Sequence, residues 1–437
     1  MNQATSTNCI FSVTNFTQVK DKVLNWANRF STFCFLDNHL YQTQSHSVEC
    51  ILAAGVIDFV KSGAGNALGL LEQFIESSSI QNIETAWLFG HLGYDLKNEI
   101  EDVYSSHNDL IQFPDLFFFK PQVVIRFDKR KLIIESKTDD AEKIFHEIFS
   151  MEDSKQIIST PVTIQNKIDK EEYISIIQKL KEHILRGDCY EINFCQEFFA
   201  NNARIDLLTV YKNLSKISPN PFSALYKLDD KYLICASPER FLKKQGNKIL
   251  SQPIKGTSKR MIDKSRDDES KKDLLLSSKD RSENVMIVDL VRNDLAKICR
   301  EGTVKVNELF GIYSFPQVHQ MISTISGELE ENISFSKIIR ATFPMGSMTG
   351  TPKKKVLELI EQYEKTKRGI FSGAVGYIDP KGNFDFNVVI RSIMYNETNQ
   401  YLAFQTGSGI TYYSDPEKEW EECLLKAEAI MKVLRAG

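Results

Sequence analysis

The sequence has no apolar run long enough to cross a membrane. A membrane-spanning helix needs roughly 18 or more consecutive apolar residues, and the longest mild run here, residues 51–60, is interrupted by Gly55 and Asp58. The N-terminus also lacks the basic segment followed by an apolar stretch that marks a secretory signal. We therefore expect a cytoplasmic protein with no membrane partner.

The sequence has little excess of either charge. Its 54 Lys and Arg residues nearly balance 58 Asp and Glu residues, which leaves a formal net charge of -4. A nucleic-acid-binding domain usually carries a basic excess, so we expect no nucleic-acid partner. The sequence also contains neither a P-loop nor a glycine-rich dinucleotide motif, which argues against a nucleotide substrate.

Closely spaced cysteine pairs are missing as well. Eight cysteines are scattered along the chain, and no two of them form a C-x-x-C pair. This distribution argues against a structural zinc site and is typical of reduced thiols in a cytosolic protein.

The patterns that are present predict an α+β fold. A polar stretch suggests a boundary between an N-terminal region, residues 1–160, and a C-terminal catalytic region, residues 161–437. Residues 374–378, 386–394 and 401–405 are predicted to be strands. Strands mixed with helices, without a regular alternation of the two, favour α+β.

Two carboxylate pairs stand at helical i, i+3 spacing. They are Asp280 with Glu283, and Glu419 with Glu422. Residues so spaced share one face of a helix, so two such helices could present oxygen ligands to a hard cation such as Mg²⁺. The same spacing is common on solvated helix faces, and Glu422 with Lys426 can form an ordinary i, i+4 ion pair. The spacing alone leaves both interpretations open.

Small-residue loops and two basic residues indicate a candidate anion site. Segments 253–257, 344–353 and 407–409 concentrate small residues, whose backbone N–H groups can approach an anion closely. Arg391 stands in an apolar predicted strand, so it should be paired or should bind a carboxylate. Lys255 lies in a tight apolar loop, where loss of water would lower its pKa and make the amine a nucleophile. Ordinary turns, a structural ion pair and a surface lysine are the competing interpretations.

Together these segments resemble the chorismate-utilising enzymes. The resemblance extends from about residue 171 to the C-terminus, with one further match, GHLGYD, at residues 90–95. The matching motifs are GDCY (187–190), PNPFSA (219–224), SPERF (237–241), PIKGT (253–257), DRSENVMIVDLVRNDL (280–295), PMGSMTGTPK (344–353), RGIFSGAVGYI (368–378) and TGSGITYYSDPEKEWEECLLKA (406–427). The resemblance implies an anthranilate-synthase-like fold, in which antiparallel sheets pack together with helices outside.

The resemblance also implies a magnesium site and a set of substrate contacts. Glu283 and Glu422 would hold Mg²⁺ against the C1 carboxylate of chorismate, with Asp280 and Glu419 as supporting or water-mediated ligands. Such a metal polarises the carboxylate, so that the ring accepts a nucleophile at C2. The residues that would contact the substrate are Arg391, Lys426, Thr349 and the backbone of Gly407, Ser408 and Gly409.

Within the family, the PIKGT loop resembles that of the aminodeoxychorismate synthases, which carry lysine where anthranilate synthases have alanine. The resemblance implies that Lys255 attacks C2 while Glu239 protonates the departing C4 hydroxyl. Ammonia from a separate glutamine amidotransferase subunit would then enter at C4 and expel the lysine. The expected product is 4-amino-4-deoxychorismate, the precursor of 4-aminobenzoate in folate synthesis.

Two further positions bear on the alternatives. Glu191 stands where the water-using isochorismate and salicylate synthases carry a lysine and the aminating enzymes usually carry glutamine. Gln320 stands where anthranilate synthases have a histidine that assists pyruvate elimination. We therefore place C4 amination ahead of three alternatives: anthranilate synthase component I, an isochorismate or salicylate synthase, and a catalytically silent chorismate-binding subunit.

Overall fold

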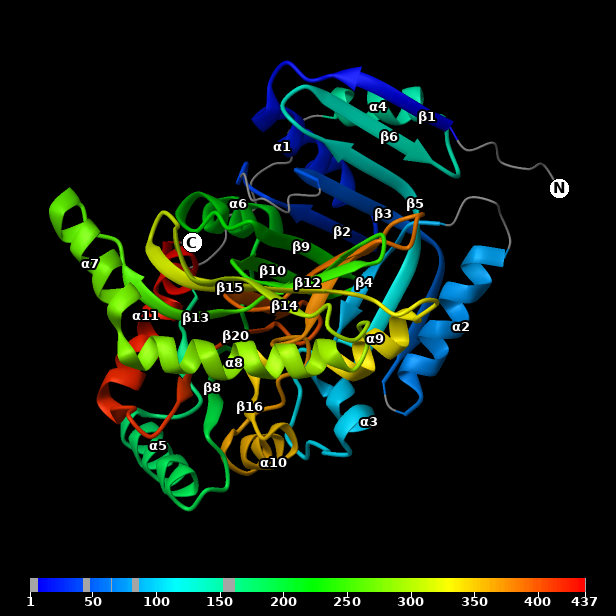
Figure 1. Cartoon of the computed structure of the whole chain (residues 1–437). Coiled ribbons are helices and arrows are strands. Elements are labelled where there is room, and N and C mark those ends of the chain that lie inside the picture. The colour runs from blue at the N-terminus through cyan, green and yellow to red at the C-terminus, as the bar shows by residue number, and fades with distance from the viewer. Residues whose placement is uncertain (1–6, 42–47, 64, 81–85, 152–161, 437) are drawn as a thin grey trace.

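The computed structural model describes residues 7–41, 48–63, 65–80, 86–151 and 162–436. Its strands form two antiparallel sheets joined by one long strand, and helices cover the outer faces (Figure 1). The predicted α+β architecture is confirmed.

The first sheet combines strands from both ends of the chain. In order of pairing its strands are β1 (Thr7–Ser12), β6 (Lys131–Ser136), β5 (Leu116–Phe127), β3 (Cys50–Ser62), β2 (Thr32–Asp37), β9 (Phe222–Leu228), β10 (Lys231–Ser237), β19 (Ser392–Asn396), β20 (Tyr401–Ile410) and β8 (Glu191–Ala200). The short strands β7 (Gln165–Asn166) and β16 (Gly350–Thr351) pair with the two ends of β8.

The second sheet is joined to the first through β5. In order of pairing its strands are β4 (Leu88–Leu92), β17 (Ala374–Ile378), β18 (Phe384–Asn387), β11 (Arg240–Gln245), β12 (Lys248–Gln252) and β15 (Val318–Glu328), and β15 also pairs with β13 (Ile254–Lys259) and β14 (Lys305–Ser314). Strand β5 pairs with β3 along its length and with β4 through its first residues. The main core lies between the two sheets and includes Phe118, Tyr226 and Phe386.

The boundary predicted near residue 160 lies outside the described residues, within 152–161. On either side of it, the chain contributes neighbouring strands to both sheets. Strand β2 pairs with β9 in the first sheet, and β4 pairs with β17 in the second. The N-terminal and C-terminal regions therefore share one hydrogen-bonded framework.

The helices lie on the outside of this framework. Four of them bury apolar faces in a second core on the first sheet: α1 (Phe16–Ala27), α4 (Ala141–Ser150), α6 (Leu207–Ile217) and α11 (Pro416–Ala436). Helices α5 (Lys170–Leu185) and α10 (Lys353–Tyr363) pack beside β8. Helix α8 (Ser278–Ala296) crosses strands β13 and β15 (Figure 1). The remaining helices are α2 (Ala67–Ile80), α3 (Lys97–Glu101), α7 (Lys264–Leu276) and α9 (Phe335–Thr342), and there are two 3₁₀ turns, η1 (Tyr94–Leu96) and η2 (Gly346–Met348), in the described residues.

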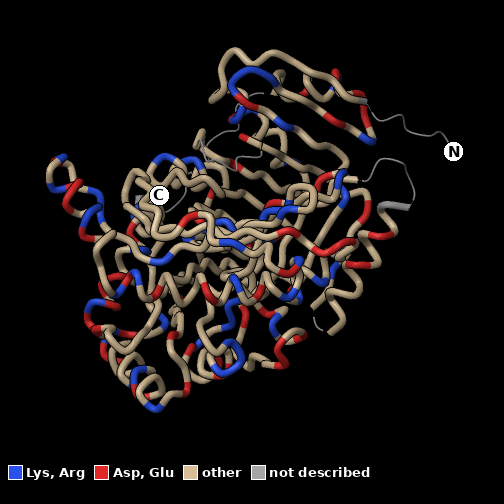
Figure 2. The backbone as a smooth tube through the Cα atoms, viewed as in Figure 1, with Lys and Arg blue, Asp and Glu red and all other residues tan. Residues whose placement is uncertain are grey.

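Charged residues of both signs are interspersed over the outer helices (Figure 2). Several form exposed ion pairs, such as Lys170 with Glu417 at 2.6 Å. Exposed pairs of this kind contribute little to stability because water and salt screen them, so the buried apolar cores hold the sheets and helices together. Within the described ranges, no helix combines the length and apolarity that crossing a bilayer requires.

The strand predicted over residues 386–394 is wrong in its middle part. Strand β18 ends at Asn387, and β19 begins only at Ser392. Between them, the Val388 N–H donates to the Glu239 carbonyl at 3.1 Å, and the Arg391 carbonyl accepts from Ala236 at 3.2 Å. The Val389 N–H donates instead to the Gly373 carbonyl at 2.8 Å, and the Ile390 N–H to the Val388 carbonyl at 2.9 Å. These residues therefore do not continue the strand, although their apolar pattern is that of one.

Candidate active site

A cavity of about 100 Å³ lies where strands β8, β13 and β20 meet helices α8 and α11. It brings together most of the residues that the sequence singled out. The predicted site residues that line it are Glu239, Lys255, Asp280, Glu283, Arg391, Gly407, Gly409, Glu422 and Lys426. They come from segments far apart in the sequence, which the two sheets bring to one place.

Three predicted residues lie behind the cavity wall. The Thr349 hydroxyl is buried and donates to the Met345 carbonyl at 3.2 Å. Ser408 lies between Gly407 and Gly409 on β20, and because side chains alternate along a strand, its hydroxyl points to the opposite face. Glu419 is fully buried on α11. Thr349 and Ser408 could therefore touch a ligand only through their backbone.

The two carboxylate pairs face each other from α8 and α11. Lys279 connects them, with its Nζ 2.7 Å from Glu419 Oε1 and 3.7 Å from Glu283 Oε1. Burial raises the pKa of Glu283 to about 8, and the nearby Glu191 and Glu422 charges add to this against the opposing effect of Lys255. Carboxylates crowded in this way are stabilised by a cation.

The oxygen atoms available here fit a hard divalent cation. Glu283 Oε1 and Glu419 Oε2 are buried and accept no hydrogen bond from any described residue, a state that costs roughly 1–3 kcal/mol per group. Among the described residues, no three of the four carboxylates bring oxygens within 4.8 Å of one another. A Mg²⁺ ion held here would take one or two of these carboxylates and complete its shell with water or substrate oxygens, as this ion usually does.

Lys255 forms a buried ion pair in the cavity wall. Its Nζ lies 2.5 Å from Glu191 Oε1. Burial lowers the pKa of the amine, but the charges of Glu191, Glu283 and Glu239 together raise the pKa above its ordinary value. The expectation of a lowered pKa is therefore wrong for the unliganded site, because burial comes with three carboxylates. The resting side chain is an ammonium that must lose a proton before it can react.

Arg391 is a half-buried cation with no carboxylate at ion-pair distance among the described residues. Its backbone is left-handed, with φ of 50°, a conformation that costs a non-glycine residue roughly 1–3 kcal/mol. Burial lowers the pKa of its guanidinium to about 10, against the opposing charge of Glu239. An unpaired guanidinium in a cavity is suited to an anionic ligand, and a carboxylate can accept from it bidentately.

Glu239 is positioned to act as an acid. It is 3% exposed, and burial raises its pKa to about 7 against the lowering effects of a Ser347 hydrogen bond and the Lys255 charge. A carboxyl group with such a pKa retains a proton in part at neutral pH and can donate it to a leaving group.

Sequence reasoning missed Asn193, Ser347 and Gln405, which also line the cavity. On β8, Glu191 and Asn193 are polar residues at alternate positions of an otherwise mostly apolar first half of the strand, a pattern that indicates one polar face. Gln405 gives no such signal, because its place beside the cavity depends on how β20 pairs with β8.

A buried ion pair supports one wall of the cavity. Arg368 Nη2 lies 2.6 Å from Glu364 Oε1. The same guanidinium donates to the carbonyls of Met348 at 2.7 Å and Asn193 at 2.8 Å. It therefore fixes the backbone of two residues that line the cavity.

Comparison with known proteins agrees with this geometry. The family model described as chorismate binding enzyme matches residues 34–432. The chain therefore belongs to the chorismate-binding enzyme family.

Individual relatives divide between two activities. The chain is 32% identical over 378 residues to aminodeoxychorismate synthase component 1 of Escherichia coli, covering 84% of this chain and 82% of the relative. It is 31% identical over 375 residues to anthranilate synthase component 1 of Aquifex aeolicus, covering 79% and 74%. Because the two identities are so similar, sequence identity alone does not distinguish between the two activities.

Solved structures share the fold at low sequence identity. Anthranilate synthase component I from Streptococcus pneumoniae matches with a TM-score of 0.76 and 24% identity, over 90% of this chain and 95% of that one. The menaquinone-specific isochorismate synthase of Escherichia coli matches with a TM-score of 0.76 and 16% identity, over 99% and 95%. The prediction of an anthranilate-synthase-like fold is confirmed.

Proposed function

We propose that this chain is component I of an aminodeoxychorismate synthase, which converts chorismate and ammonia into 4-amino-4-deoxychorismate and water. The observation that carries the proposal is the position of Lys255, whose amine lies in the same cavity as Glu239 and Arg391. The product would serve 4-aminobenzoate and folate synthesis in the cytoplasm, and a separate glutamine amidotransferase subunit would supply the ammonia.

Chorismate carries two carboxylates, and the cavity offers groups for both. The unpaired Arg391 guanidinium and the N–H groups around Gly407 and Gly409 would hold one of them. Glu283 and Glu422 would hold Mg²⁺, with Asp280 and Glu419 in support, and the bound ion would neutralise the C1 carboxylate and make C2 electrophilic. Lys426 fixes the wall near these glycines, because its Nζ donates to the Gly407 carbonyl at 2.8 Å.

The reaction then proceeds through two displacements. Lys255 passes a proton to Glu191, and its free amine forms a bond to C2 while the ring double bond shifts and the C4–O bond breaks. Glu239 gives its proton to the departing hydroxyl, which leaves as water. Ammonia next bonds to C4, the double bond shifts back, and the C2–N bond to Lys255 breaks. The ammonia nitrogen loses one proton to Glu239, Glu191 returns its proton to the freed Lys255 amine, and the enolpyruvyl group is retained.

Anthranilate synthase component I is the second candidate, because relatives with that name are about equally similar. That reaction aminates C2 and eliminates pyruvate. Gln320 lines the cavity where the resemblance would require a histidine for that elimination, and under this proposal Lys255, not ammonia, attacks C2. Both residues favour C4 amination.

Product analysis tests the proposal. Purified protein would be incubated with chorismate, MgCl₂ and ammonium chloride at mildly alkaline pH, and the products would be separated by chromatography with mass detection. We expect an aminated product that retains the enolpyruvyl group and yields 4-aminobenzoate when a lyase is added. Anthranilate as the main product would replace the proposal with the second candidate.

A Lys255→Ala variant tests the covalent step. We expect formation of the C4-aminated product to fall by about a thousandfold or more, since nucleophilic catalysis is lost. Lys259→Ala, at an exposed position of the same strand, is the matched control and should keep full activity. Because Glu191 loses its buried partner in Lys255→Ala, the double variant with Glu191→Gln checks that the loss is not caused by unfolding. Undiminished C4 amination by Lys255→Ala would rule out the covalent mechanism.

A further inference from the structure

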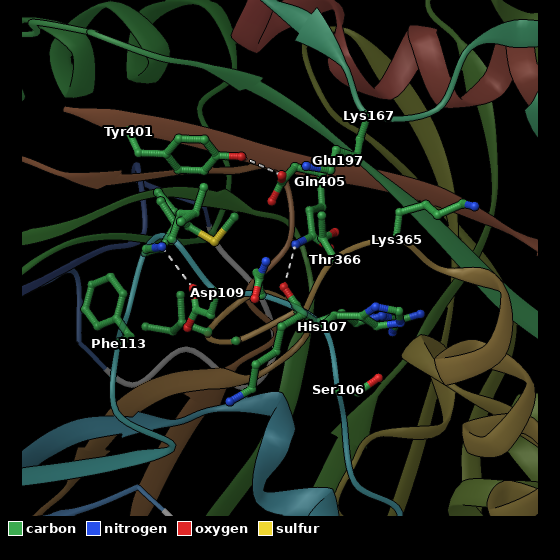
Figure 3. Close-up of a pocket in the computed structure, with 18 residues that line it drawn as sticks. Ser106, His107, Asp109, Phe113, Lys167, Glu197, Lys365, Thr366, Tyr401 and Gln405 are labelled. Carbon is green, nitrogen blue, oxygen red and sulfur yellow. Dashed lines mark hydrogen bonds between the residues drawn. The ribbon is translucent and has the colours of Figure 1, made fainter. Parts of the chain in front are cut away.

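Figure 3 shows a second cavity, of about 230 Å³. It adjoins the cavity that contains Lys255 and Glu239, which is called the chorismate cavity below. Residues 106–111 and 365–370 form much of its wall, together with side chains from β8 and β20. Figure 3 shows the Tyr401 hydroxyl directed at the Glu197 carboxylate, with Gln405 beside it. None of the chemistry proposed above uses this cavity.

The two cavities adjoin each other at one shared residue. Gln405 lines both of them. Arg368 lines the second cavity, and the two carbonyls to which its guanidinium donates belong to Asn193 and Met348, which line the first.

Both cavities lie along one face of the β8–β20 strand pair. Gln405 stands directly opposite Glu197, and Gly409 stands opposite Asn193. Alternate side chains share a face and lie roughly 6.6 Å apart along a strand, so about 13 Å separates Glu197 from Asn193. Only Cys195 and Gly407, two small residues, stand between them on that face.

Most of the basic residues around the second cavity already have an acidic or aromatic partner. Lys365 pairs with Glu172 at 2.9 Å, Lys367 lies 3.6 Å from Asp115, and Arg368 pairs with Glu364. Lys167 lies over the Phe199 ring at 5.2 Å.

Two carboxylates on the cavity wall, Glu197 and Asp109, have no such partner. Within the described ranges, neither has a Lys, Arg or His nitrogen within 4.0 Å. Glu197 Oε1 accepts from the Tyr401 hydroxyl at 2.7 Å, and Asp109 Oδ1 accepts from the Ile111 and Gln112 N–H groups at 2.9 Å each. Each carboxylate therefore keeps its second oxygen for a cationic ligand.

We propose that this second cavity binds ammonium and passes ammonia to the chorismate cavity beside Gln405. The inference rests on the proposed function, which requires ammonia to reach C4 while chorismate occupies its own cavity. Ammonium is a small cation with four N–H donors, and the free oxygens of Glu197 and Asp109 match it in charge and hydrogen bonding.

The attacking species must be neutral, so ammonium has to lose a proton before it reaches C4. Glu197 takes it: one N–H bond breaks, one O–H bond forms, and the carboxylate becomes a neutral acid beside neutral ammonia. The proton then returns to solvent at the side of the cavity where Asn108 and Lys365 are exposed. Burial raises the pKa of Glu197 to about 7, against the Tyr401 hydrogen bond and the Lys167 charge, which makes the carboxylate a better base than an ordinary one.

The test is the Michaelis constant for ammonium, measured with ammonium chloride as the only nitrogen source at fixed pH and saturating chorismate and magnesium. We expect Glu197→Gln and Asp109→Asn each to raise the KM for ammonium about fivefold or more, because each removes a charge-assisted hydrogen bond. The KM for chorismate should stay unchanged. The matched control is Glu308→Gln, since Glu308 also accepts from a tyrosine hydroxyl, that of Tyr313 at 2.7 Å, but lies on β14 away from both cavities.

The outcomes separate this inference from the proposed function. If the unmodified protein forms no aminated product, the proposed function fails first. If it does form the product and both variants keep the same KM for ammonium, the cavity has no part in ammonia delivery. A parallel rise in the KM for chorismate would show that the variants distort the chorismate site instead, and would equally overturn the inference.

Discussion

Carboxyl groups within one cavity differ in what surrounds each of them. Glu191 is paired with Lys255 at 2.5 Å, whereas the burial of Glu239 outweighs its hydrogen bonds to Ser347 and the Ile254 backbone and the charges of Lys255 and Lys426. Glu283 lies among other carboxylates. One site thus holds an ion-pair partner for an amine, a carboxyl group that retains its proton in part at neutral pH, and a candidate metal ligand. Environment, and not residue type, separates the three roles.

Glu239 should set the alkaline limit of the reaction. Its pKa in the folded protein is raised from 4.5 to about 7, so the acid form is lost as pH rises through 7, and kcat/KM should decline there. The Glu239→Gln variant should lose about a hundredfold in kcat, and its pH profile should lack that decline. An unchanged alkaline limb in the variant would remove Glu239 from the role of acid.

The same shift has a consequence for stability. A carboxyl group whose pKa is raised by folding binds its proton more tightly in the folded state than in the unfolded chain. Its contribution to stability is therefore complete below about pH 4.5 and is lost as pH rises through 7. Thermal melts of Glu239→Gln should show a weaker fall in Tm across this interval than melts of the unmodified protein.

Glu422 should control the magnesium requirement. Replacing it with glutamine removes a charged oxygen ligand, so the magnesium concentration for half-maximal activity should rise about tenfold or more. Glu421→Gln, at the neighbouring exposed position of α11, should leave the magnesium titration unchanged. Identical titrations for the two variants would exclude Glu422 from the metal site.

At the scale of elements, the two glycines of β20 differ in which atoms a Cβ would meet. A Cβ at Gly409 would lie 2.8 Å from Glu191 Oε1 and 2.8 Å from Lys255 Nζ, both ends of flexible side chains. A Cβ at Gly407 would lie 2.0 Å from the Phe194 carbonyl oxygen, which is backbone. The first contact disturbs the catalytic ion pair, and the second disturbs the pairing of β20 with β8.

Alanine substitutions should separate these effects. Gly409→Ala should lower kcat/KM about tenfold or more with little change in Tm, because side chains can move aside. Gly407→Ala should destabilise the fold by roughly 1–3 kcal/mol, as overpacking against backbone does. Enzyme kinetics and thermal melts of both variants provide the measurements. Equal losses of activity and stability in the two variants would contradict the distinction.

What the sequence could predict depends on how local each feature is. Asp280 with Glu283 follows directly from helical spacing on α8, and the polar face of β8 follows from alternation at Glu191 and Asn193. The left-handed turn at Arg391 could not be predicted, since its apolar neighbours are typical of a continuous strand. Features that depend on long-range strand pairing could not be predicted either, because nothing near Gln405 in the sequence indicates which strand will lie beside it.

For the whole molecule, the shared sheets decide whether the chain divides into separate folding units. Strands from before and after residue 160 are hydrogen-bonded to each other in both sheets, through the pairs β2–β9 and β4–β17. The cores extend across the same divide: Phe33 and Phe35 of β2 belong to one cluster with Leu225 of β9. A fragment lacking β2 and β4 would expose these apolar faces and leave two strand edges unpaired.

We therefore expect the fragment 162–437 to lack a cooperative thermal transition when it is produced alone, although it contains every predicted catalytic residue. The full chain should unfold in one transition, because the two regions lose their common core together. Calorimetry of the fragment and the full chain makes the comparison, and co-production of 1–161 with 162–437 is the control, since it restores the missing strands. A fragment that melts cooperatively near the Tm of the full chain would show that the C-terminal region is an independent domain. Formation of the cavity would then not require the N-terminal strands. The pairing of β2 with β9 and of β4 with β17 predicts the opposite, that the cavity walls form only when both regions are present.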